Sequence, residues 1–90
     1  MSEQSNVEEN LTLDQALAWI AEMFEEPVAN IREGTQRSEI AGWDSLGQLI
    51  LMSALDQRFG IRLTPPELSS LTSVQHILAI LARNGHLQTS

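Results

Sequence analysis

The sequence has no cysteine, no lysine and no tyrosine. Without cysteine the chain forms no disulfide, no thiolate metal site and no cysteine nucleophile. Its five basic residues are all arginines and stand against twelve acidic residues, which gives a net charge of −7. Because so few cations cannot build a wide positive face for phosphates, we expect no nucleic-acid partner.

Long apolar runs are also absent. No stretch approaches the about 18–20 consecutive apolar residues that span a bilayer, and residues 1–10 are polar and acidic, unlike a secretory signal. We therefore expect a cytoplasmic protein with no membrane partner. Aromatic residues make up only 4% of the chain, so the core is expected to be largely aliphatic.

The length of 90 residues fits one small domain, and the apolar fraction of 42% is enough for one modest core. Residues 1–10 have no hydrophobic periodicity and are expected to form a disordered tail. We expect the folded domain to cover residues 11–85, with residues 86–90 as a second tail, and the protein to be a monomer.

Three segments repeat apolar residues at helical spacing, and each follows residues that cap helices. The first follows a capping-box pattern at Thr12 and is stopped by Pro27. The second runs from Ser45 to Phe59, and the third begins after Ser73 and ends at Asn84. These patterns predict three main helices.

The connections complete the predicted fold. Residues 25–43 show no clear period, and we expect Val28, Ile31 and Ile40 to pin this long segment to the core. Thr64 opens a second capping-box pattern and predicts one short helical turn. The expected fold class is therefore all-α: a small helical bundle of three main helices plus one short helix, with a long first loop.

The helix predicted from Ser45 to Phe59 has more apolar residues than one face holds. One stripe, assigned to the core, consists of Leu51, Leu55 and Phe59, joined by Met52. The other consists of Leu46, Leu49 and Ile50, continued by Ser53. One stripe suffices for a small core, so the second is either a contact surface or is buried against the long loop.

The most informative stretch is Gly42 to Leu46. Asp44 is a good helix N-cap, and Ser45 takes the first helical position, where its hydroxyl is expected to be exposed at the positive end of the helix dipole. Free N–H groups there would stabilise an attached anion. The competing interpretation is that this Asp-Ser pair merely starts a helix.

Context favours the first interpretation, because the chain resembles the acyl carrier protein family. The resemblance rests on Gly42, Asp44, Ser45 and Leu46, followed by the helix end Ala54-Leu55-Asp56-x-x-Phe59. It continues through Ile61, Leu63, Pro66-Glu67 and Thr72-Ser73-Val74, and in helix order covers about residues 11–81.

The resemblance implies a non-catalytic carrier. In this family a Mg²⁺-dependent phosphopantetheinyl transferase esterifies the serine, here Ser45, with 4′-phosphopantetheine from coenzyme A, and Asp44 would assist. The arm then holds an acyl group as a thioester, which an acyl- or aminoacyl-loading ligase supplies and a downstream transferase or synthase takes. The lack of cysteine agrees with this, because the chain has no thiol of its own.

The second predicted helix departs from the family pattern. Positions often acidic in the family hold Gly47, Ile50, Gln57 and Arg58, and Gly47 weakens the first turns by up to about 1 kcal/mol relative to alanine. These departures favour a dedicated biosynthetic pathway over bulk fatty-acid synthesis. We expect partners to contact Leu46, Leu49 and Ile50, and Trp43 is either a packing residue or a fourth contact.

Other functions have less support. An aminoacyl or peptidyl carrier is a close alternative, and a helical interaction module that is never modified is a more distant one. A hydrolase is not favoured, because Trp43 replaces the first glycine of the Gly-x-Ser-x-Gly motif. His76 and His86 are interpreted as solvated, Trp19 as a packing residue, and the scattered acids predict no metal site.

Overall fold

A computed structural model describes residues 10–88 and shows an all-α fold. Its α-helices are α1 (Leu13–Met23), α2 (Ser45–Phe59), α3 (Pro65–Ser69) and α4 (Val74–Arg83), with the 3₁₀ turns η2 (Val28–Asn30) and η3 (Arg37–Glu39) between α1 and α2. Over the described residues, extended pairing is limited to isolated bridges. The predicted fold class of three main helices, one short helix and a long first loop is confirmed.

Side-chain caps fix where the helices begin. Thr12 and Gln15 form a reciprocal capping box at α1, and the Asp44 carboxylate caps α2. At α3 the backbone N–H and hydroxyl of Thr64 donate to the Glu67 carboxylate, and these bonds lower the pKa of Glu67. Since each cap satisfies N–H groups that a helix start leaves open, the local sequence determines these boundaries.

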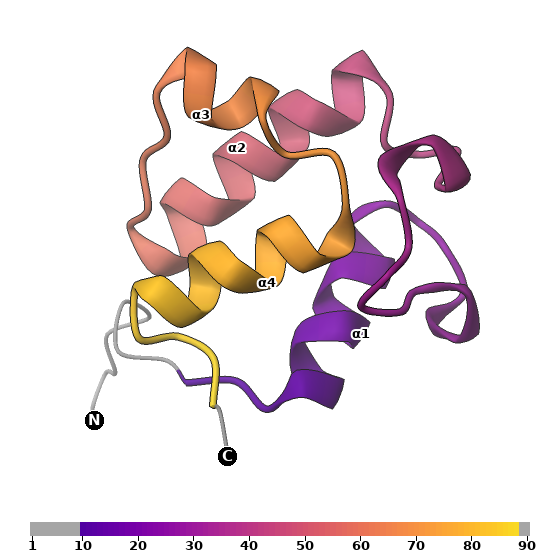
Figure 1. Cartoon of the computed structure of the whole chain (residues 1–90), viewed down its shortest axis with the longest axis horizontal. Coiled ribbons are helices and arrows are strands. Elements are labelled where there is room, and N and C mark those ends of the chain that lie inside the picture. Colours follow the sequence, from indigo (N-terminus) through magenta and orange to yellow (C-terminus); the bar gives the residue numbers. More distant parts are fainter. Residues whose placement is uncertain (1–9, 89–90) are drawn as a thin grey trace.

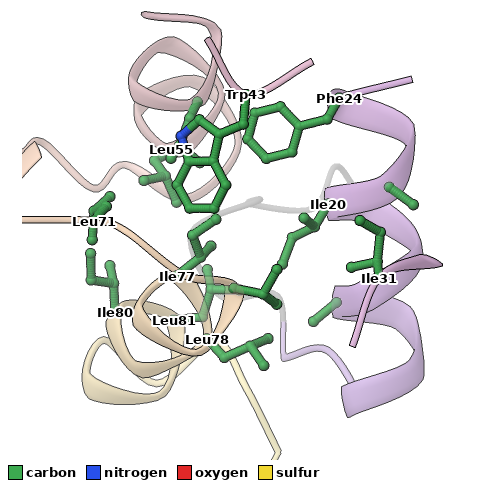
Figure 2. Close-up of a cluster of buried hydrophobic side chains, with 14 of the residues drawn as sticks. Ile20, Phe24, Ile31, Trp43, Leu55, Leu71, Ile77, Leu78, Ile80 and Leu81 are labelled. Carbon is green, nitrogen blue, oxygen red and sulfur yellow. The ribbon is translucent and has the colours of Figure 1, made fainter. Parts of the chain in front are cut away.

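The helices surround one aliphatic core. Figure 1 shows α2 and α4 crossing the middle of the molecule, α3 over one side and α1 at a steep angle to them. In Figure 2, Ile20 of α1, Leu55 of α2 and Ile77 and Leu81 of α4 all point into the space between the helices. None of these four side chains exposes any surface to solvent. The core therefore joins all three long helices.

The two stripes of α2 have different environments. Leu51, Leu55 and Phe59 are buried, as predicted. Met52 is wrongly assigned to that stripe, because it lies at the edge of the buried face and is 36% exposed. Only one face of α2 therefore contributes to the core.

The segment between α1 and α2 is attached to the core at two of the three expected points. Ile31 and Ile40 are buried, and each follows directly on a 3₁₀ turn. Val28 is 55% exposed, so its predicted anchoring is wrong. It opens the turn η2, whose geometry directs the next buried side chain, Ile31, inward instead. The loop is thus ordered by two short turns rather than by a periodic element.

The two ends of the described chain pair with each other. The Leu11 N–H donates to the His86 carbonyl at 2.8 Å, and the Gln88 N–H donates to the Leu11 carbonyl at 2.7 Å. His86 is buried, and the centre of its ring lies 4.9 Å from the centre of the Phe59 ring. The expectation of a solvated His86 is therefore wrong, because this pairing draws the residue against α2. Of the predicted tail at residues 1–10, residues 1–9 lie outside the described residues.

Within residues 10–88, no helix is long and apolar enough to cross a membrane.

Candidate functional site

The start of α2 presents a hydroxyl and unpaired backbone donors on the surface. Asp44 caps the helix: its Oδ1 accepts from the Gly47 N–H at 2.9 Å, and its carbonyl accepts from the Gln48 N–H at 2.8 Å. Ser45 is the first helical residue and is exposed. Among the described residues, the N–H groups of Ser45 and Leu46 have no acceptor. The site thus combines an accessible hydroxyl with donors suited to an anion.

Backbone contacts hold this helix start in place. A Cβ at Gly47 would overlap the Gly42 carbonyl oxygen, and a Cβ at Gly42 would overlap the Phe24 carbonyl oxygen. The first turn of α2, the preceding loop and the end of α1 therefore pack backbone against backbone. Both positions need glycine because any side chain would push these segments apart.

Trp43 anchors the residues directly before the serine. It is 2% exposed, and its ring stacks on Phe24 with 5.1 Å between centroids and 16° between planes. Figure 2 shows the two rings next to each other above Ile20. The Trp43 carbonyl also accepts from Arg37 Nε at 3.0 Å. Trp43 is therefore a packing residue, and its expected role as a partner contact is wrong because the indole does not reach the surface.

The buried side-chain amide of Gln48 links Trp43 to α3. Trp43 Nε1 donates to Gln48 Oε1 at 2.5 Å, and Gln48 Nε2 donates to the Leu68 carbonyl at 2.6 Å. Gln48 is 9% exposed and lies on α2 one turn after Asp44. The loop, α2 and α3 are therefore joined by one polar chain.

An apolar surface without charge borders the serine. Leu46, Leu49 and Ile50 are 65%, 54% and 42% exposed. The alternative in which this stripe is buried against the long loop is therefore wrong. From Ser45 to Leu55 the sequence has no charged residue, although the chain as a whole carries −7. A patch of this kind next to a functional group is typical of a contact surface.

The histidines do not join this site. His76 is exposed on α4, where its Nδ1 accepts from the Thr72 N–H at 3.1 Å, and His86 is buried against Phe59 near the other end of α2. In the described part of the chain, no three His, Asp or Glu side chains gather as a metal site would require. The chemistry available at the start of α2 is thus that of a hydroxyl, backbone donors and the Asp44 carboxylate.

Sequence reasoning missed Gln48 and Arg37. A signal for Gln48 was present, since it precedes Leu51 by three residues and Leu55 by seven and so continues the buried stripe of α2. Arg37 carries no such signal, because its contact with the Trp43 carbonyl depends on the course of the long loop.

These features define a class of protein: a small helical domain that displays one serine at a helix start instead of enclosing a substrate. The family model described as the phosphopantetheine attachment site matches residues 14–81, and the chain belongs to this family. Its members carry a covalently attached 4′-phosphopantetheine group and generally act as non-catalytic carriers that meet a phosphopantetheinyl transferase and synthetic enzymes. Neither the curated proteins nor the solved structures gave a significant match.

Proposed function

We propose that Ser45 carries the phosphopantetheine group and that the protein holds acyl groups for a dedicated biosynthetic pathway. The observation that carries this proposal is the exposed Ser45 hydroxyl at the start of α2, next to N–H groups without acceptors. When attached, the group supplies a terminal thiol that binds an acyl chain as a thioester. The chain's own residues present the hydroxyl and stabilise the charge of the phosphate.

In the attachment step, Ser45 Oγ would form a bond to the phosphorus of the pantetheine phosphate, and the bond from that phosphorus to the oxygen of the adenylate half of coenzyme A would break. A base of the transferase would take the serine proton, and adenosine 3′,5′-bisphosphate would leave. The Ser45 and Leu46 N–H groups favour the resulting phosphodiester charge, while the transferase provides the catalytic groups and Mg²⁺.

Intact-mass measurement tests the assignment. After incubation with coenzyme A and a broad-specificity transferase, the protein should gain the mass of one phosphopantetheine. Ser45→Ala should gain none yet remain folded, because the hydroxyl is exposed and makes no contact in the core. Ser53→Ala is the matched control, since Ser53 lies on the exposed side of the same helix, and it should be modified like the wild type. Modification of Ser45→Ala would show that another residue is used.

We also propose that partner enzymes dock on the apolar surface formed by Leu46, Leu49 and Ile50. Apolar groups lose their hydration at low cost, whereas an acidic surface would need matching cations on the partner. Ile50→Glu should therefore weaken loading by the dedicated ligase about tenfold, because a carboxylate would be desolvated in the contact. Loading kinetics measure this effect, and mass spectrometry of the loaded protein identifies whether the cargo is acyl or aminoacyl.

Gln57→Glu provides the control for this surface. It adds the same charge on an exposed position of α2 two turns further on, and it should leave loading unchanged. Partner affinity should also depend only weakly on salt, since no charged side chain lies between Ser45 and Leu55 to be screened. A steep loss of affinity with salt, together with a neutral Ile50→Glu, would move recognition to the acidic N-terminal half.

A further inference from the structure

Gln48 is the centre of a buried network of hydrogen bonds within a mainly apolar core. Its Oε1 accepts from the indole N–H of Trp43, and its Nε2 donates to the Leu68 carbonyl at the end of α3. Trp43 and Gln48 are 2% and 9% exposed. Burying such groups is costly unless both partners are present. This network therefore requires one specific arrangement of the three segments that it joins.

Only a carboxamide of this length serves both ends of the network. A carboxylate would accept from Trp43 but could not donate to Leu68. An apolar side chain would leave the indole N–H unpaired, and the Leu68 carbonyl would keep only the Leu71 N–H as a donor. Fully satisfied buried networks specify a geometry more than they add stability. We therefore expect Gln48 to determine how the loop and α3 are placed against α2.

The residue held by these hydrogen bonds is Trp43, which lies two positions before Ser45. Trp43 is held by Phe24 on its ring face, by Gln48 at its indole nitrogen and by Arg37 at its carbonyl. Asp44 then caps α2, and Ser45 follows as the first helical residue. With Trp43 fixed from three sides, the backbone that leads into the serine has little freedom.

We infer that Gln48 is a positioning residue for the modification of Ser45: by joining Trp43 to Leu68 it holds the loop and α3 against α2, so that the hydroxyl meets the transferase in one orientation. This inference rests on the proposed function of Ser45. Gln48 itself is buried and touches neither the partner nor the group that is transferred. Its effect passes through Trp43, and misplacing a reacting atom by about 1 Å can slow a reaction by as much as about 100-fold.

The kinetics of transfer separate positioning from loss of folding. Gln48→Met has a similar volume and removes both hydrogen bonds. We expect it to lower kcat for Ser45 modification about tenfold with little change in KM, because the docking surface stays intact. A partly unfolded carrier would instead raise the apparent KM, since it reduces only the concentration of competent protein. Leu78→Val, a change at a buried residue of α4, is the control for stability and should leave kcat unchanged.

Trp43→Phe provides a second variant. It keeps an aromatic ring to stack on Phe24 and removes the N–H donor together with part of the buried indole volume, so it should lower kcat in the same direction. If Gln48 acts through Trp43, the double variant should be no slower than the slower single variant. If the two single variants each lower kcat and the two reductions multiply in the double variant, the residues act independently and the inference is overturned.

Hydrogen exchange of the unmodified protein gives a readout that needs no transferase. Gln48→Met should speed exchange of the hydrogen-bonded Trp43 and Gly47 amides and of the amides at the end of α3, while α4 keeps its protection. Wild-type kcat in folded Gln48→Met, or exchange that rises equally throughout the core, would refute positioning. If the wild-type protein takes up no phosphopantetheine, the proposed function fails instead, and the exchange experiment still decides whether Gln48 holds the loop.

Discussion

Gly47 lies in the first turn of α2 with its α-carbon against the Gly42 carbonyl oxygen. In an exposed helix, alanine would be favoured over glycine by about 1 kcal/mol. Here an added methyl group has no room, because the obstructing atom belongs to the backbone and the loop behind it rests on Phe24. The close approach brings the serine-bearing turn directly onto the end of α1.

We therefore predict that Gly47→Ala destabilises the protein despite the better helix propensity of alanine. Overpacking of this kind costs about 1–3 kcal/mol, and denaturant unfolding measures it. Gly34→Ala is the control, since nothing lies within 4 Å of a Cβ at that position, and it should be neutral or slightly stabilising. A more stable Gly47→Ala would show that the loop yields and that the contact has no structural role.

Local sequence could not reveal these residue contacts. From the sequence, Gly47 is only a weak point in a helix, and Trp43 is equally suited to packing or to binding a partner. Both questions depend on where the loop of residues 25–43 returns to α2, and that course is determined by Ile31, Ile40 and the stacked Phe24 and Trp43 rings. By contrast, the cap at Asp44 and the exposure of Ser45 follow from their own helix start and were predictable.

At the scale of the element, α2 has two faces with separate tasks. Leu51 and Leu55 are fully buried, whereas Leu49 on the opposite side is 54% exposed. Leu55 therefore belongs to the core and Leu49 to the surface of the same helix. Because both are leucines of α2, replacing each by alanine allows a direct comparison of the two faces.

We predict that Leu55→Ala costs about 2–5 kcal/mol, which includes the cavity it leaves. The total stability expected for so small a domain is about 5 kcal/mol, so the variant should melt at a much lower temperature. Leu49→Ala should change stability by no more than about 0.5 kcal/mol and should weaken partner loading. Equal melting temperatures of the two variants would contradict the assigned faces.

The elements themselves were largely predictable because their signals are local. Capping boxes at Thr12 and Thr64 and the glycine after Phe59, at φ 69°, determine where helices begin and end. The errors arose at the margins of helix faces and inside the loop. Met52 lies next to the buried stripe, and Val28 begins a three-residue turn that has no period to read.

At the scale of the whole molecule, the two ends of the described chain pair with each other. Leu11 bonds to both His86 and Gln88, and His86 fills a place between this pairing and Phe59. Contacts between residues more than 70 positions apart leave no periodic signal in the sequence. The domain bounds of residues 11–85 stay a prediction, and of the predicted tail at residues 86–90 the first residue, His86, is buried.

We predict that His86→Ala lowers stability by about 1–3 kcal/mol, as expected for the loss of a buried side chain. Thermal unfolding measures the change, and loss of protection of the Leu11 amide in hydrogen exchange would locate it at the paired ends. His76→Ala is the comparison: its side chain is exposed on α4, so the loss should be smaller. A larger effect at His76 would mean that the ends contribute little to the fold.

The pairing of Leu11 with His86 and Gln88 has a topological consequence. Because the two ends of the described chain lie together at one edge of the bundle, as Figure 1 shows, the order of the helices along the chain is not essential to their packing. A short linker from Gln88 back to Asn10, with a new opening at the exposed Gly34, would give a circular permutant with the same core. In that arrangement the serine-bearing helix would be the first α-helix of the chain, preceded only by η3 and the rest of the loop.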